Sequence, residues 1–163
     1  MVLSVDDVVA KFPMKAMPKI NQEPDYRNIN TMMQLLYGNA ASLPTTLGGG
    51  QHVHLGIIMT PQLYTTLVST PYKSPPDPVI TPTHATGALA AIQQTYFLEH
   101  KEERRIYENH HTMEDTLKSI IIDAVDEVII GKLRNKYTGY LGITARYLLD
   151  HLFDRDILRR KNV

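Results

Sequence analysis

The amino-acid sequence predicts a mainly α-helical protein with little or no sheet. All ten prolines lie between Pro13 and Pro82, and proline breaks helix interiors because it lacks a backbone N–H donor. The second half of the chain has no proline after this point, is rich in good helix formers, and carries apolar residues at spacings of three and four. This is the period of one helix face. Together these observations predict about five helices and a long proline-rich loop.

Composition excludes several classes of function. A chain of 163 residues without cysteine is long enough for one domain and contains no disulfide, zinc-thiolate site or thiol nucleophile. Seventeen basic and seventeen acidic residues cancel, so no chain-wide positive field attracts nucleic acid. Locally, residues 99–131 hold nine acids against four bases, and residues 132–163 hold eight bases against three acids. A contact with phosphate is therefore expected near the C-terminus.

We also expect a soluble cytoplasmic protein with no membrane partner. The longest apolar runs are far shorter than the ~20 residues that cross a bilayer. Asp6 and Asp7 interrupt the first twelve residues, where a secretory signal requires an unbroken apolar stretch.

The first half of the chain is predicted to hold an arm and one regular helix. Residues 1–23 show no sustained periodicity and are interpreted as an arm that is ordered only where it packs on something and is otherwise flexible. A single domain then spans residues 24–156. Asp25 can cap a helix over residues 26–41. The apolar stripe of this helix consists of Ile29, Met32, Met33, Leu36 and Ala40.

Shorter elements follow. The apolar residues between Val53 and Ile58 fit either a brief extended segment or a helical turn. Thr60 and Pro61 are a cap and a proline at the first helical position, which predicts a short helix. The segment from Thr70 to Pro82 is proline-rich and is predicted to be an extended, exposed connector.

The second half is predicted to contain three helices. The first covers residues 83–109; its uncharged beginning predicts that it starts buried and ends in solvent. Thr112, with Asp115 three residues later, approximates a capping box for a second helix, whose apolar stripe runs from Leu117 to Leu133. Two glycines predict a loop over residues 137–142. The last helix is capped by Thr144 and buries Tyr147, Leu148, Leu149, Leu152 and Phe153, while residues 157–163 form a basic tail that is free to fray.

The glycine-rich segment before the short apolar set is the first candidate site. His52 and His54 are separated by one residue, so in an extended segment they point to the same side and could share a metal ion. A metal site requires further ligands, and local hydrogen bonding and packing explain the pair more simply. Gly48, Gly49 and Gly50 lack the Lys-Ser or Lys-Thr pair of a phosphate-binding loop and predict a tight bend.

Basic residues near the C-terminus are the second candidate site. They alternate with tyrosines, a pattern suited to contacts with a nucleic acid backbone and bases. Ordinary surface charge is the favoured explanation, because the net positive charge of the region is small. The candidate RNA contacts are Lys132, Arg134, Lys136, Arg155, Arg159 and Arg160.

Four stretches of the sequence carry a family resemblance. They are LYGNAASLPTTLGGGQH at residues 36–52, HKEERRIY at residues 100–107, LRNKYTGY at residues 133–140 and LLDHL at residues 148–152. In order and spacing they resemble the Gag region of copia-type long-terminal-repeat retroelements, over residues 19–153. The resemblance implies a helical capsid-like bundle that self-assembles into particle shells around the element's RNA.

The sequence therefore predicts a structural, self-associating protein rather than an enzyme, with other copies of itself as the main partner. It predicts no cofactor and no catalytic residue, and only weak RNA contact because no zinc knuckle can form without cysteine. Two alternatives stay open. One is a metal-dependent hydrolase that uses His52 and His54, and the other is a helical RNA-binding or adaptor module.

Overall fold

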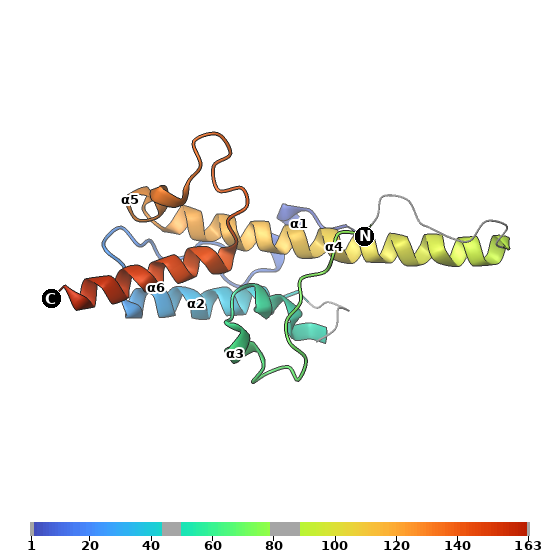
Figure 1. Cartoon of the computed structure of the whole chain (residues 1–163), viewed down its shortest axis with the longest axis horizontal. Coiled ribbons are helices and arrows are strands. Elements are labelled where there is room, and N and C mark those ends of the chain that lie inside the picture. Colours follow the sequence, from blue (N-terminus) through green and yellow to red (C-terminus); the bar gives the residue numbers. More distant parts are fainter. Residues whose placement is uncertain (1, 44–49, 79–88, 163) are drawn as a thin grey trace.

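The structure, a computed structural model, describes residues 2–43, 50–78 and 89–162. This part of the chain contains six α-helices, two 3₁₀ helices and no strand (Figure 1), which confirms the prediction of a mainly α-helical protein. The α-helices are α1 (Val5–Lys11), α2 (Tyr26–Ala40), α3 (Pro61–Tyr64), α4 (Ala90–Ala124), α5 (Glu127–Ile130) and α6 (Ala145–Lys161). The 3₁₀ helices are η1 (Gly50–Ile57) and η2 (Gly131–Leu133).

The predicted helix caps are confirmed. The side chain of Asp25 accepts a hydrogen bond from the backbone N–H at the third position of α2. Thr60 caps α3 in the same way, with Pro61 at the first helical position. Thr144 caps α6. Each cap satisfies one of the donors that a helix leaves unpaired at its N-terminus, so these three helices begin where the sequence places them.

The predicted break between two helices near Thr112 is wrong, because α4 is one continuous helix of 35 residues that includes Thr112. The hydroxyl of Thr112 donates to the carbonyl of Glu108, 2.9 Å away and one turn earlier, instead of capping a new helix. The expected direction of burial is also wrong. Residues 90–104 are exposed except for the half-buried His100, and the buried positions of α4 begin at His110. In Figure 1 this first part of α4 extends away from the other helices, and we call residues 90–104 the projecting half.

The end of α4 is set by a distant segment. The sequence predicts that the apolar stripe continues to Leu133, but the helix stops at Ala124. The backbone N–H of Ile20 donates to the Ala124 carbonyl at 2.8 Å, and the N–H of Asp126 donates to the Ile20 carbonyl at 2.9 Å. Pairing with Ile20 takes the place of the next helical hydrogen bonds. As a result Val128, predicted to be buried, is 81% exposed.

The arm predicted at residues 1–23 packs against the rest of the domain and forms α1. Its apolar side chains Val8, Phe12, Met17 and Ile20 are buried in the core. The buried Asn39 on α2 fastens it further, because its side-chain oxygen accepts from the Met14 N–H at 3.0 Å and its side-chain nitrogen donates to the Met14 carbonyl at 2.7 Å. The arm is therefore part of the single core.

Helix α6 crosses this core and is regular to its end. Leu148, Leu149 and Leu152 are fully buried, whereas Tyr147 of the predicted apolar face is exposed. The tail that was expected to be free to fray is helical as far as Lys161. Helices α2, α4 and α6 contact one another, and Figure 1 shows α2 and α6 running side by side below the C-terminal half of α4.

Candidate functional site

A cluster of buried polar rings lies where α4 meets η1 and the proline-rich segment. The His54 and His110 rings have their centroids 5.5 Å apart. The Tyr72 hydroxyl lies 2.9 Å from Nε2 of His110, and Nδ1 of His54 lies 3.2 Å from the Leu43 carbonyl. Nδ1 of His110 has no hydrogen-bond partner among the described residues. The Leu43 carbonyl therefore satisfies His54, whereas Nδ1 of His110 is the polar atom of the cluster without a partner in the described residues.

Burial sets the charge state of this cluster. His54 is 5% exposed and His110 is 3% exposed, and desolvation disfavours the charged form of an imidazole. Burial lowers the pKa of His54. Burial, together with the neighbouring His54 and His111, lowers the pKa of His110 to about 4. Burial also raises the pKa of Tyr72. At neutral pH the cluster is therefore uncharged.

Gly56 sets the position of the tyrosine ring. A Cβ atom at this position would lie 2.0 Å from Cδ2 of Tyr72, so only glycine allows η1 to approach the ring this closely. On its other side Tyr72 meets Tyr64, edge to face, with ring centroids 5.6 Å apart. The proline-rich segment is therefore anchored at Tyr72 instead of lying wholly in solvent as an exposed connector.

A pocket of about 360 Å³ opens beside this cluster. Its apolar lining includes Ile57 of η1, Pro61 of α3 and Met59 between these two helices, and Glu114 of α4 is the one carboxylate among the described lining residues. The complete lining is Gly56, Ile57, Met59, Pro61, Thr65, Pro71, Tyr72, Ser74, Glu114, Thr144 and Arg146. We call it the Glu114 pocket.

The two charged side chains of the Glu114 pocket, Glu114 and Arg146, have different hydrogen-bond and ion-pair partners. Burial raises the pKa of Glu114, and a hydrogen bond from the Ala145 backbone at the start of α6 opposes this effect. Arg146 donates to the Ile58 carbonyl at 2.7 Å and pairs with Asp150. No ion pair within 4.0 Å joins Glu114 to a cation in the described residues. The pocket therefore presents an apolar wall and a carboxylate without a cationic partner.

Of the predicted histidine pair, only the side chain of His54 is described. His54 points into the core, and its ring neighbours are His110 and the Leu43 carbonyl. The predicted sites at Gly48 and Gly49 lie outside the described residues, and so do the side chain of His52 and the surroundings of Gly50. Among the residues described, no group of three or more histidine, aspartate or glutamate side chains is placed to hold a metal ion.

Most of the predicted RNA contacts are already paired with acids. Arg155 binds both carboxylate oxygens of Glu23, each at 2.7 Å. Arg159 and Arg160 pair with the buried Asp156, and Arg134 pairs with Glu127. In the described part of the chain, Lys132 and Lys136 are in no ion pair. Four of the six residues are thus paired, with three acids between them, which weakens the electrostatic basis for RNA contact.

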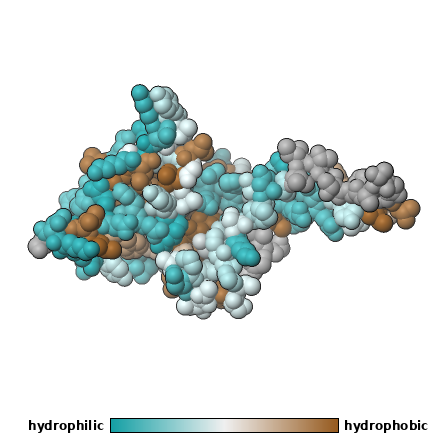
Figure 2. All heavy atoms as spheres, in the orientation of Figure 1, coloured by the Kyte–Doolittle hydropathy of each residue, from teal (hydrophilic) through white to brown (hydrophobic). Residues whose placement is uncertain are grey.

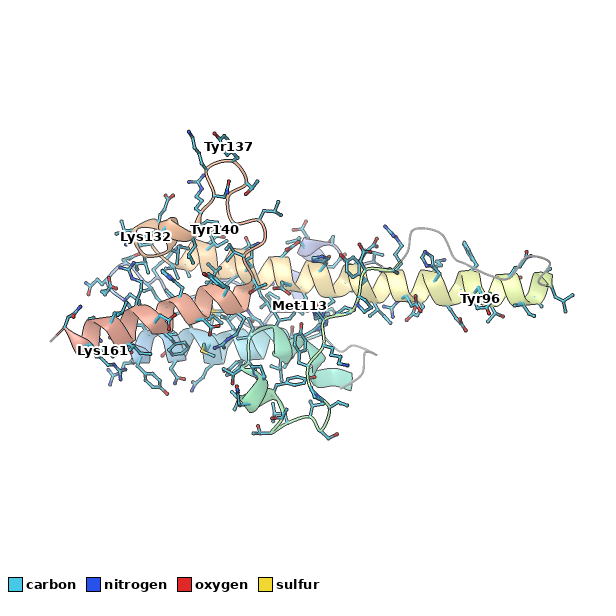
Figure 3. All side chains as sticks on the ribbon, viewed as in Figure 1. Tyr96, Met113, Lys132, Tyr137, Tyr140 and Lys161 are labelled. Carbon is cyan, nitrogen blue, oxygen red and sulfur yellow. The ribbon has the colours of Figure 1, made fainter. Side chains whose placement is uncertain are left out.

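The surface that sequence reasoning missed is the projecting half of α4. Leu89 is 71% exposed, and four apolar residues that follow it are also exposed. These are Ile92, Tyr96, Phe97 and Leu98. Hydrophobic atoms lie at the free end of this helix (Figure 2), and Tyr96 points away from the helix axis into solvent (Figure 3). The spacing of these residues was visible in the sequence, but it was interpreted as a buried helix start.

Comparisons with family models, with curated proteins and with solved structures returned no match. The likeness to the copia-type Gag region therefore stays a prediction from the sequence. Across residues 2–43, 50–78 and 89–162, no helix has both the length and the hydrophobicity needed to cross a membrane.

Proposed function

We propose that this chain is a structural, self-associating protein of the Gag or capsid type, and that copies meet through the projecting half of α4. The observation that carries the proposal is the set of five apolar side chains, from Leu89 to Leu98, exposed on a helix that extends beyond the core. Apolar side chains gathered in this way mark an interaction site more often than a free surface.

The exposed residues continue the buried stripe of the same helix. Met113, Leu117 and Ile120 are buried and recur at spacings of four and three. When the alternating steps of three and four residues are counted back from Met113, they pass several mostly polar positions and then reach Ile92 and Leu89. A helix that repeats apolar residues in this way packs against another helix. The core of this chain covers the second half of the stripe, and we propose that a second copy covers the first half.

The area available fits a weak contact. Residues 90–104 span roughly 22 Å at ~1.5 Å per residue. Tyr96 and Phe97 each carry ~150–250 Å² of surface. Leu98 lies on the opposite side of the helix from Leu89, so covering one face on both copies removes at most roughly 1,000 Å², below the ~1,200 Å² of stable specific interfaces. The contact is therefore expected to be weak for a single pair and to gain strength when many copies assemble.

The charges on the projecting half suit pairing between copies. Lys101 lies between Glu99 and Glu103 on the exposed surface. Arg104 and Glu102 are paired within the chain, with Glu108 and Arg105 respectively. An antiparallel partner brings acids of one copy towards bases of the other, and such pairs set orientation more than they add affinity. The proposal includes no RNA contact through the C-terminal arginines, because their paired state does not support one.

Sedimentation velocity over a concentration series tests this function. The full chain should associate at hundreds of micromolar, and the double variant Ile92→Ser, Tyr96→Ser should shift the association to at least tenfold higher concentration. A matched control is Gln94→Ser, Thr95→Ser, which changes exposed polar residues of the same helix and should leave association near that of the wild type. A monomeric wild type, or a double variant that associates like it, would overturn the proposal.

A further inference from the structure

An ordered loop presents a single aromatic side chain to solvent. The loop over residues 134–143 is held by two backbone hydrogen bonds between Asn135 and Gly139, at 2.7 and 2.9 Å. The side chain of Asn135 also accepts from the backbone N–H groups of Tyr137 and Thr138. Gly139 has a φ of 63°, which favours glycine. The loop is therefore fixed by its own hydrogen bonds.

Tyr137 stands at the tip of this loop and is 87% exposed. Figure 3 shows the labelled ring well away from the helices. The ammonium of Lys136 lies 5.5 Å from the centre of the ring, so the tip is an aromatic body with a positive charge beside it. An ordered loop that holds a tyrosine out in this way loses little conformational entropy when the ring is buried by a partner.

The Glu114 pocket has the complementary properties. Its volume of about 360 Å³ exceeds the ~150 Å³ of a cavity that binds benzene, so a phenol ring fits with room for part of its neighbour. The lining is apolar, and Glu114 lacks a cationic partner in the described residues. Arg146, the cation of the pocket, is engaged with Ile58 and Asp150, so the Glu114 carboxylate accepts a hydrogen bond from the Ala145 backbone but forms no ion pair within 4.0 Å in the described residues.

We propose that Tyr137 of one copy inserts into the Glu114 pocket of a second copy, with Lys136 placed against Glu114. Charge complementarity argues for this occupant, because the loop brings a cation and an aromatic ring together and the pocket brings a carboxylate and an apolar wall together. The inference rests on the proposed self-association and supplies it with a second contact.

The positions of loop and pocket determine the kind of assembly. The loop lies on one side of α4 and α6, and α3, which supplies part of the pocket, lies on the other (Figure 1). Two different surfaces of the chain therefore meet, and a contact of this type forms closed rings or open arrays rather than isolated dimers. Each copy uses its loop on one neighbour and its pocket on the other.

The test uses the full chain in the Ile92→Ser, Tyr96→Ser background, so that the α4 contact does not contribute. Tyr137→Ser removes the ring but leaves the pocket intact. Thr65→Trp places a large side chain at the exposed edge of the pocket and leaves the loop intact. Sedimentation velocity should show that each variant is monomeric alone and that the two form a dimer when mixed. In the mixture the intact loop of the Thr65→Trp variant can bind the intact pocket of the Tyr137→Ser variant.

Two further variants test the chemistry of the contact. Glu114→Gln keeps the shape of the side chain and its acceptor for the Ala145 N–H, but removes the charge, and should weaken the association at least tenfold. Tyr147→Ser, which changes an exposed tyrosine on α6, is the control and should associate like the background. Circular dichroism and thermal melting check that each variant is folded.

The outcomes separate this inference from the proposed function. If the mixture of Tyr137→Ser and Thr65→Trp stays monomeric, or Glu114→Gln has no effect, the loop contact is overturned whether or not α4 mediates association. If the mixture dimerises while Ile92→Ser, Tyr96→Ser leaves wild-type association unchanged, the α4 contact is overturned and the loop contact stands.

Discussion

Acidification from pH 7 to pH 5 should destabilise the folded chain through His110. In the fold the pKa of this imidazole is lowered by burial and by the nearby His54 and His111, to about 4 from an ordinary 6.5. Between these two values the unfolded chain binds a proton that the folded chain does not, so the free energy of unfolding falls as the pH falls. At ~1.4 kcal/mol for each pH unit, the loss between pH 6.5 and pH 5 is about 2 kcal/mol.

Two neighbouring groups modify this loss. Burial lowers the pKa of His54, which adds to the loss over the same range. Burial raises the pKa of Glu114, one turn further along α4. The folded chain then holds a proton on Glu114 more tightly than the unfolded chain does, so this group offsets part of the loss as the pH falls through its folded pKa. Tyr72, which faces His110, stays protonated throughout because burial raises its pKa.

Urea unfolding followed by circular dichroism at pH 7, 6 and 5 measures the effect. His110→Gln keeps an amide within reach of the Tyr72 hydroxyl but cannot take up the proton, so its free energy of unfolding should fall by about 2 kcal/mol less than that of the wild type over this range. The control is His100→Gln on the projecting half of α4, which should retain the wild-type pH dependence. If His110→Gln shows the same pH dependence as the wild type, the reasoning from burial is refuted.

Two packing predictions concern the same region and the arm. Gly56→Ala forces the ring of Tyr72 to move and should lower the free energy of unfolding by roughly 1–3 kcal/mol. The control is Gly131→Ala, whose new Cβ meets only a flexible side chain at 3.2 Å; it should be neutral or stabilise the fold by up to ~1 kcal/mol. Equal losses of stability for the two variants in urea unfolding would contradict the packing of Tyr72 against Gly56. Asn39→Ala leaves the N–H and C=O of Met14 without their partner and should cost ~1–3 kcal/mol. Limited proteolysis should then cleave the arm faster than in the wild type, and an unchanged cleavage rate would show that Asn39 does not fasten it.

The local features of the fold could be predicted from the sequence. The caps at Asp25, Thr60 and Thr144 and the apolar stripes of α2 and α6 depend on neighbours within one or two helical turns. Such signals are contained in a short window of residues, and the structure confirms them except at Tyr147 of α6, which is exposed. The absence of strands in the described residues agrees with the same helical periodicity.

The candidate sites were harder to predict because their parts come from distant segments. His54 was singled out as one of a metal-binding pair, yet its partners in the fold are His110 and the Leu43 carbonyl. Nothing in the sequence brings Tyr72 or Glu114 to the same place. The arginines near the C-terminus were recognisable as basic, but the pairing of Arg155 with Glu23 joins residues 132 positions apart.

By itself the sequence determined that the protein is mainly helical and where α2, α3 and α6 begin, because caps and the period of the helix depend on short-range backbone chemistry. Only the tertiary structure decided where α4 ends, since the hydrogen bonds of Ile20 compete with the next helical turn. It also decided which half of the α4 stripe is covered. An apolar stripe has the same pattern whether its own chain or another copy buries it, and the arrangement of the other helices leaves the first half of α4 exposed.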